Sequence, residues 1–202
     1  IIIYILFNFL LSGPIAFKAF DYNLTDSFYG RGDYVIVLAS SQLETYLTNP
    51  NPSLGGDFVK FKNSQGFNVH IVSLDEEYVD SNGIVQESIS SAEELKNYLI
   101  NYDNESNGML EYVLMVGDVN GQYTIPTFTI NSYNEQEIDV TDYPYSFTDN
   151  PYEPKFFIGR WPIRTIPELL NIKSRSIQYV TNENLLLSND DLEFYNNAML
   201  VA

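Results

Sequence analysis

Two charged residues lie at the carboxyl ends of apolar runs. If these runs are strands of a parallel sheet, this is the edge at which such sheets hold their ligands and catalytic groups. Asp118 ends the run "EYVLMVGD", and Arg160 lies near the end of "KFFIGRWP". Such residues can bind a charged substrate, hold a cation or form ion pairs. We expect Arg160 to be partly buried, and a buried guanidinium requires an acidic or carbonyl partner. The candidates include Asp118 and Asp142, and we interpret the arginine as half of a structural ion pair rather than as a substrate-binding group.

A glycine precedes each of these two residues in the sequence. Gly117 allows a tight exit from its strand or the close approach of another backbone segment. Gly159 stands directly before Arg160. Asp118 could bind a cation, cap the turn that follows or orient a partner, and a structural use is favoured. We therefore expect structural roles for Gly117, Gly159 and Arg160.

Calcium is the metal ion that the residue types of this chain favour. Ca²⁺ prefers carboxylate and carbonyl oxygens, and acidic residues gather in the region 119–154. We take Asp118, Asp139 and Asp142 as candidate calcium ligands. The spacing does not match an EF-hand loop, so a solvated acidic loop is the alternative interpretation, and no cofactor is required. The acidic cluster of the region comprises Glu135, Glu137, Asp139, Asp142 and Asp149.

The chain has one histidine and no cysteine, which limits the catalysis it can carry out. A disulfide framework, a Cys/His zinc site and a cysteine nucleophile are all excluded within these residues. His70 lies between Val69 and Ile71 in the middle of an apolar run. A histidine in such a strand is more often packed or hydrogen-bonded than catalytic, and we interpret His70 in that way.

The bulk composition indicates a folded, strongly acidic protein. Hydrophobic residues make up 45% of the 202 residues and aromatic residues 15%, which is enough for a sizeable core. The formal net charge is −17 at pH 7. Nucleic-acid binding depends on neutralising phosphates with lysine and arginine, so we expect no nucleic-acid partner.

The N-terminal residues are typical of a secretory signal peptide. Residues 1–20 begin with a nearly uninterrupted apolar run, followed by Ser12, Gly13 and Pro14. The run is too short for a membrane span, so we expect no stable one. Residues 21–32 are polar and rich in turn-forming types, and we interpret them as a linker. A secreted or cell-surface location follows from this interpretation.

The remaining chain alternates between strand and helix patterns. Short β-branched runs and amphipathic segments at βαβ spacing predict a parallel sheet flanked by helices, which is an α/β fold. Between the third and fourth strands lies a long polar excursion with a small hairpin. We also expect a fifth strand to begin at 197–202 and the chain to be cut within it. The other predicted strands are 33–40, 67–74, 111–118 and 155–162, and the predicted helices are 53–67, 88–102 and 165–183.

Five segments, in order, resemble the gingipain-type cysteine peptidases, which are relatives of the caspases. Two of them lie upstream, in "DYVIVLASSQLETYL" and "FVKFKNSQGFNVHIVSLDE". The other three are "EYVLMVGDVNGQYTIPTF", "DYPYSF" and "KFFIGRWPIRTIPELLNIKSRSIQYVTNE". Single segments are weakly specific, but their shared order over 33–202 makes the resemblance fairly specific.

The resemblance implies a caspase-like fold with two adjacent subdomains. Residues 33–154 would form the first subdomain, and 155–202 would open the second. The family's catalytic pair is a histidine in a His-Gly dipeptide and a cysteine at the end of a later strand, both downstream of 197–202. No catalytic residue is therefore carried over, and His70, which precedes Ile71, does not match the dipeptide.

The implied function is that of an N-terminal fragment of a secreted cysteine endopeptidase whose full-length form cleaves protein or peptide substrates. The alternative is a secreted binding or structural module on the same fold, without catalysis.

Overall fold

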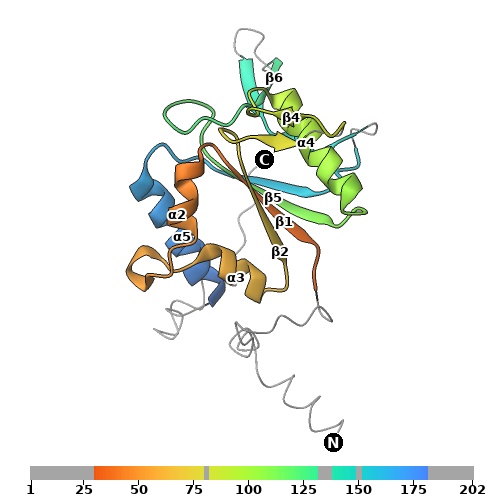
Figure 1. The fold of residues 1–202 in the computed structure, drawn as a ribbon. Coiled ribbons are helices and arrows are strands. Elements are labelled where there is room, and N and C mark those ends of the chain that lie inside the picture. Colours follow the sequence, from red (N-terminus) through yellow and green to blue (C-terminus); the bar gives the residue numbers. More distant parts are fainter. Residues whose placement is uncertain (1–29, 80–81, 132–137, 149–151, 182–202) are drawn as a thin grey trace, which may run out of the picture.

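The computed structural model describes residues 30–79, 82–131, 138–148 and 152–181 (Figure 1). Its centre is a four-stranded parallel sheet with the strand order β2-β1-β5-β8. β1 is buried along its whole length, because its apolar run "DYVIVL" is covered on both faces. The predicted parallel sheet is therefore present. Its strands are β1 (Asp33–Leu38), β2 (Asn68–Ser73), β5 (Leu110–Val116) and β8 (Phe157–Trp161).

Helices cover both faces of the sheet, as the alternation of side chains along β1 requires. Ile36 and Leu38 point to one face and pack in the cluster that includes residues of α3 and α5. Val35 and Val37 point to the other face and pack with Leu95 and others beneath α4. The helices are α2 (Glu44–Leu47), α3 (Phe58–Ser64), α4 (Ala92–Glu105) and α5 (Ile166–Thr181).

The two long helices, predicted at 88–102 and 165–183, each begin at a capping box. At the start of α4 the Ser91 hydroxyl accepts a hydrogen bond from the Glu94 backbone N–H, and the Glu94 carboxylate accepts one from the Ser91 N–H. Thr165 and Glu168 exchange the same pair of bonds at the start of α5. These bonds satisfy N–H groups that have no partner within the helix, so they fix where each helix starts.

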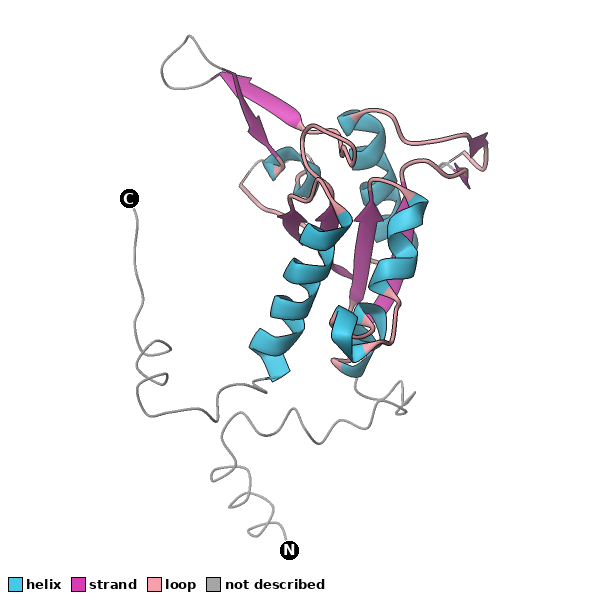
Figure 2. Ribbon diagram, turned by 90° about the vertical axis from the view of Figure 1, so that its left-hand side faces the viewer, coloured by secondary structure: helices cyan, strands magenta, loops and turns pink. Residues whose placement is uncertain are grey.

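The excursion between β5 and β8 contains the predicted hairpin, formed by β6 (Phe128–Asn131) and β7 (Ile138–Thr141). Figure 2 shows it extending away from the sheet. After β7 the chain returns through a 3₁₀ turn, η5 (Tyr143–Ser146), which packs beside α4. A second small hairpin, β3 (Tyr78–Val79) with β4 (Val85–Gln86), follows β2.

Two local features differ from the sequence-based expectations. The predicted helix at 53–67 begins only at Phe58, because Gly55 and Gly56 have positive φ angles of 83° and 76°, which a right-handed helix cannot include. The one-turn helix α2 was not predicted, since four residues are too few for a helical period. The predicted signal peptide and fifth strand lie outside the described residues.

The predicted boundary between 154 and 155 does not separate two packed bodies in the described part of the chain. β8 follows this boundary and pairs with β5 in the same sheet. α5 packs against α2 and α3 on one face of that sheet. The assignment of residues 155–202 to a second subdomain stays a prediction.

A buried lysine joins α5 to α2. The Lys173 side chain is fully buried, and its Nζ donates a 2.6 Å hydrogen bond to the carbonyl of Tyr46, in the last turn of α2. Burial lowers the pKa of Lys173. The Tyr46 carbonyl is one of the C-terminal helix carbonyls that lack a partner within the helix, so it is a suitable acceptor for this ammonium group.

None of the helices in the described ranges is long and apolar enough to cross a membrane.

Gly117 and Gly159 should differ sharply in their tolerance of alanine. A Cβ atom at Gly117 would lie 2.9 Å from the Ala39 Cβ, from a side-chain carbon of Ile125 and from the Tyr123 carbonyl oxygen. A Cβ atom at Gly159 would meet nothing within 4 Å. Gly117→Ala should therefore lower the free energy of unfolding by about 1–3 kcal/mol, measured by urea unfolding.

Gly159→Ala is the matched control and should change that free energy by less than about 0.5 kcal/mol. Equal losses in the two variants would show that the crowding around Gly117 does not set its tolerance.

Candidate functional site

The carboxyl ends of β5 and β8 meet at one edge of the sheet, where ligand sites of open α/β sheets form. Arg160 pairs in register with Met115, so it lies one position before the end of both strands. Asp118 follows two residues after the end of β5. The sheet thus brings the two charged residues singled out from the sequence to the same edge.

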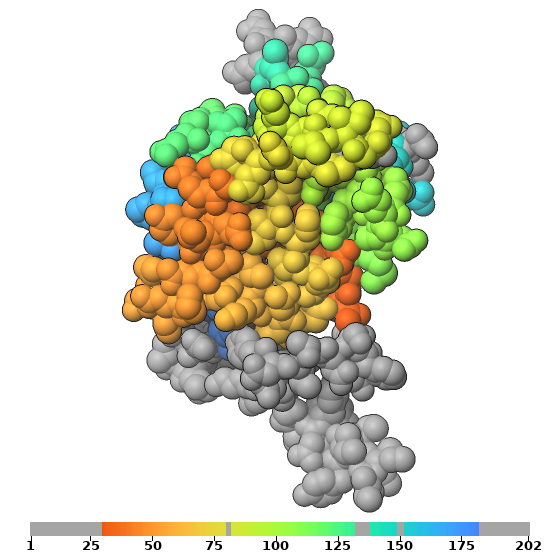
Figure 3. Space-filling model, in the orientation of Figure 1, coloured from red at the N-terminus to blue at the C-terminus, as the bar shows by residue number. Residues whose placement is uncertain are grey.

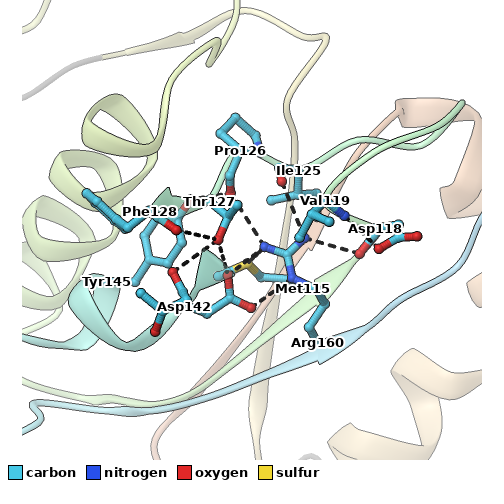
Figure 4. A network of polar contacts seen from close by, with 12 residues as sticks. Met115, Asp118, Val119, Ile125, Pro126, Thr127, Phe128, Asp142, Tyr145 and Arg160 are labelled. Carbon is cyan, nitrogen blue, oxygen red and sulfur yellow. Dashed lines mark hydrogen bonds and ion pairs between the residues drawn. The ribbon is translucent and has the colours of Figure 1, made fainter. Parts of the chain in front are cut away.

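Arg160 forms a two-pronged ion pair with Asp142, at the start of η5 (Figure 4). Its Nε donates to Oδ2 of Asp142 at 2.8 Å, and its Nη2 donates to Oδ1 at 2.7 Å. Only 9% of the arginine side chain and 24% of the aspartate side chain is exposed. The predicted structural ion pair is therefore present, with Asp142 as the partner of Arg160.

The remaining N–H groups of Arg160 donate to backbone carbonyls and to one sulfur atom. Nη1 lies 3.2 Å from the carbonyl oxygen of Gly117 and 3.3 Å from that of Ile125. Nη2 lies 3.4 Å from the carbonyl oxygen of Pro126 and 3.3 Å from Sδ of Met115. One guanidinium thereby holds the end of β5, the segment 125–126 and η5 together.

Neighbouring hydroxyl groups fix Asp142 and η5 in this position. The Thr127 hydroxyl lies 3.2 Å from Oδ1 of Asp142 and 3.0 Å from the Thr141 carbonyl oxygen, and it donates its single hydrogen to one of these acceptors at a time. The buried Tyr145 donates its hydroxyl hydrogen to the Pro126 carbonyl. Burial raises the pKa of Tyr145, so this phenol stays protonated and remains a donor at neutral pH.

Asp118 forms a separate ion pair with Arg164, in the turn between β8 and α5. The other carboxylate oxygen of Asp118 accepts a 2.7 Å bond from the Val119 N–H. The hydrogen bond from Arg164 holds the pKa of Asp118 below its usual value, with a further contribution from the Val119 N–H. Arg164 was not singled out from the sequence, because it lies in a turn and its partner is 46 residues away.

The structure does not gather the three candidate calcium ligands around one point. Asp118 and Asp142 each face a guanidinium, and Asp139 is exposed on β7. Within the described ranges, no group of three or more acidic or histidine side chains is placed to hold a metal ion. The acidic residues Glu135, Glu137 and Asp149 lie outside those ranges, and calcium binding stays a prediction.

His70 is packed among tyrosines rather than beside a nucleophile. Its Nε2 lies 2.9 Å from the Tyr98 hydroxyl, and its ring stacks on Tyr102 with centroids 4.9 Å apart. The Tyr102 hydroxyl donates to Asp33 at 3.2 Å. Burial lowers the pKa of His70, so the ring is mainly neutral at pH 7. This environment agrees with the interpretation of His70 as a packed residue.

A family model described as peptidase family C25 matches residues 30–202. The chain belongs to peptidase family C25. No curated protein matches it. Arg160 connects three of the five segments that carry the resemblance: the one with the end of β5 and residues 125–126, the one with η5, and the one with β8, to which Arg160 itself belongs.

Two solved structures have a fold similar to that of this chain. A crystal structure of the Arg-specific cysteine proteinase gingipain R is 20% identical over 75% of this chain, with a TM-score of 0.50. A structure described as a protease is 21% identical over 73% of this chain, with a TM-score of 0.52. The match spans 28% of each of those longer chains. The fold is therefore the caspase-like α/β arrangement of a parallel sheet between helices.

Replacing Asp118 with Asn should flatten the acid side of the pH–stability profile. Because the pKa of Asp118 is held below its ordinary 3.8, its ionised form stabilises the folded state. That contribution is complete above about pH 4 and is lost as the pH falls through the lowered pKa. Between about pH 4 and pH 2, the wild-type chain should thus lose stability more steeply than Asp118→Asn in urea unfolding.

Asp139→Asn is the control, because it makes the same charge change at an exposed position of β7. Parallel profiles for the wild-type chain and Asp118→Asn would contradict the assigned role of the Arg164 ion pair.

Proposed function

We propose that this chain is the N-terminal, non-catalytic part of the peptidase domain of a secreted cysteine endopeptidase. The observation that carries the proposal is the family match over residues 30–202. The Arg160 network supports it, since it joins three of the five segments that resemble the family. Protein or peptide substrates follow from the family's class of reaction.

The reaction would be attack of a cysteine thiolate on a peptide carbonyl. A histidine would carry the proton to the leaving amine, and backbone N–H groups would hold the developing oxyanion. This chain contains no cysteine, and its single histidine, His70, is held between Tyr98 and Tyr102. The nucleophile and the proton carrier would therefore come from residues after Ala202, as the family resemblance implies.

The chain's own contribution would be to position those groups. Arg160 and Asp142 fix the carboxyl edge of the sheet, and the bond between Arg164 and Asp118 fixes the start of α5 against the same edge. Catalytic geometry depends on such support, because a reacting group that is displaced by about 1 Å can lose much of its effect.

Secretion is part of the same proposal. Residues 1–20 have the apolar run and small-residue flank of a signal peptide, and the net charge of −17 suits a solvated extracellular surface. A secreted or surface location would place the peptidase among protein substrates outside the cell.

The 202-residue chain alone should hydrolyse no peptide, whereas the complete gene product should do so in a thiol-sensitive manner. The test is to read the coding DNA beyond Ala202, express the complete product and assay a mixed peptide library before and after alkylation with iodoacetamide. Alkylation should abolish the activity, because the thiolate is the nucleophile.

The matched control replaces the one cysteine that follows a predicted strand with alanine, and this variant should be inactive. Hydrolysis by the isolated chain that survives alkylation would contradict the proposal. A reading frame without a downstream His-Gly and cysteine would instead favour the non-catalytic module.

A further inference from the structure

A groove runs along β2, on the face shown in Figure 3. Its volume is about 690 Å³. One wall is β2, the opposite wall is α4, and one end is closed by Glu76, Glu77, Asn82 and residues of the β3–β4 hairpin. None of the interactions assigned above to the Arg160 network uses this groove.

The groove follows the free edge of the sheet. In the part of the chain that the structure describes, β2 is an end strand and pairs only with β1. Four successive β2 residues, 70–73, line the groove. Because successive strand side chains point to opposite faces, a groove that touches all four must run beside the backbone edge. Edge strands of this kind can accept a further strand.

The α4 wall presents one polar and aromatic stripe to the groove. The lining residues of the helix recur at intervals of four, which places them on one face. Tyr98 and Tyr102 bring aromatic rings, and Asn97 and Asn101 bring amides. Burial raises the pKa of Tyr98 to about 12, so its phenol is protonated at neutral pH. Such rings attract the cationic heads of lysine and arginine.

The groove is negatively charged. Its ionisable lining consists of tyrosines, the mainly neutral His70 and four glutamates, and none of the described lining residues is lysine or arginine. A negatively charged groove suits a cationic ligand. The four glutamates are Glu76, Glu77, Glu94 and Glu105.

We propose that this groove binds an extended, basic segment of a separate polypeptide, which adds as a strand to the free edge of β2. The backbone of the segment pairs with β2, and its lysine or arginine side chains meet the glutamates and tyrosine rings. This binding does not depend on the proposed peptidase activity.

The test measures the binding of blocked, fluorescently labelled seven-residue peptides to the full chain by anisotropy. The first peptide alternates lysine or arginine with valine, the second has glutamate at the basic positions, and the third keeps the basic sequence with N-methylated central amides. The basic peptide should bind at micromolar to millimolar concentration. The acidic and N-methylated peptides should bind at least about tenfold more weakly.

Protein variants locate the site. Glu76→Gln with Glu77→Gln should weaken binding of the basic peptide roughly three- to tenfold. Glu44→Gln, which removes the same type of charge from an exposed position of α2, should leave binding unchanged.

Three results would each overturn the proposal: no binding of the basic peptide up to millimolar concentration, equal binding of the acidic peptide, or full binding of the N-methylated peptide. Binding that is unaffected by the paired glutamate variant would do the same, since the peptide would then lie elsewhere.

Discussion

The structure depends on the burial of one guanidinium group. Removing an arginine charge from water is unfavourable unless every N–H group finds an acceptor. Arg160 meets this condition only when Asp142 and the carbonyls of Gly117, Ile125 and Pro126 converge on it. These acceptors come from three separate segments, so one side chain fixes the path of the chain after β5.

This constraint explains how a long polar excursion can be part of a well-packed domain. The excursion leaves β5 through Gly117, whose missing side chain gives room for Ile125 and for the Tyr123 carbonyl. It returns through η5, where the buried Tyr145 closes against Pro126. A long insertion is tolerated where its ends are anchored, and here both anchors lie at the carboxyl edge of the sheet.

The sequence predicted the periodic elements well and the long-range partners only in part. The apolar runs and the Ser91 capping box place strands and helices, because these signals are local. The sequence offered both Asp118 and Asp142 as partners for Arg160, and only the fold decides between them. Arg164 was missed, since its pairing with Asp118 depends on how a turn meets a strand end. The groove beside β2 was also missed, because it exists only between separate elements.

A double-mutant cycle between Arg160 and Asp142 tests the central claim most directly. The free energies of unfolding of Arg160→Met, Asp142→Asn and the double variant would be measured in urea against the wild-type chain. If the pair organises the edge of the sheet, either single change leaves the other partner unsatisfied, and the coupling energy should be about 2 kcal/mol or more. The account would be contradicted if the losses of the two single variants summed to the loss of the double variant within about 0.5 kcal/mol.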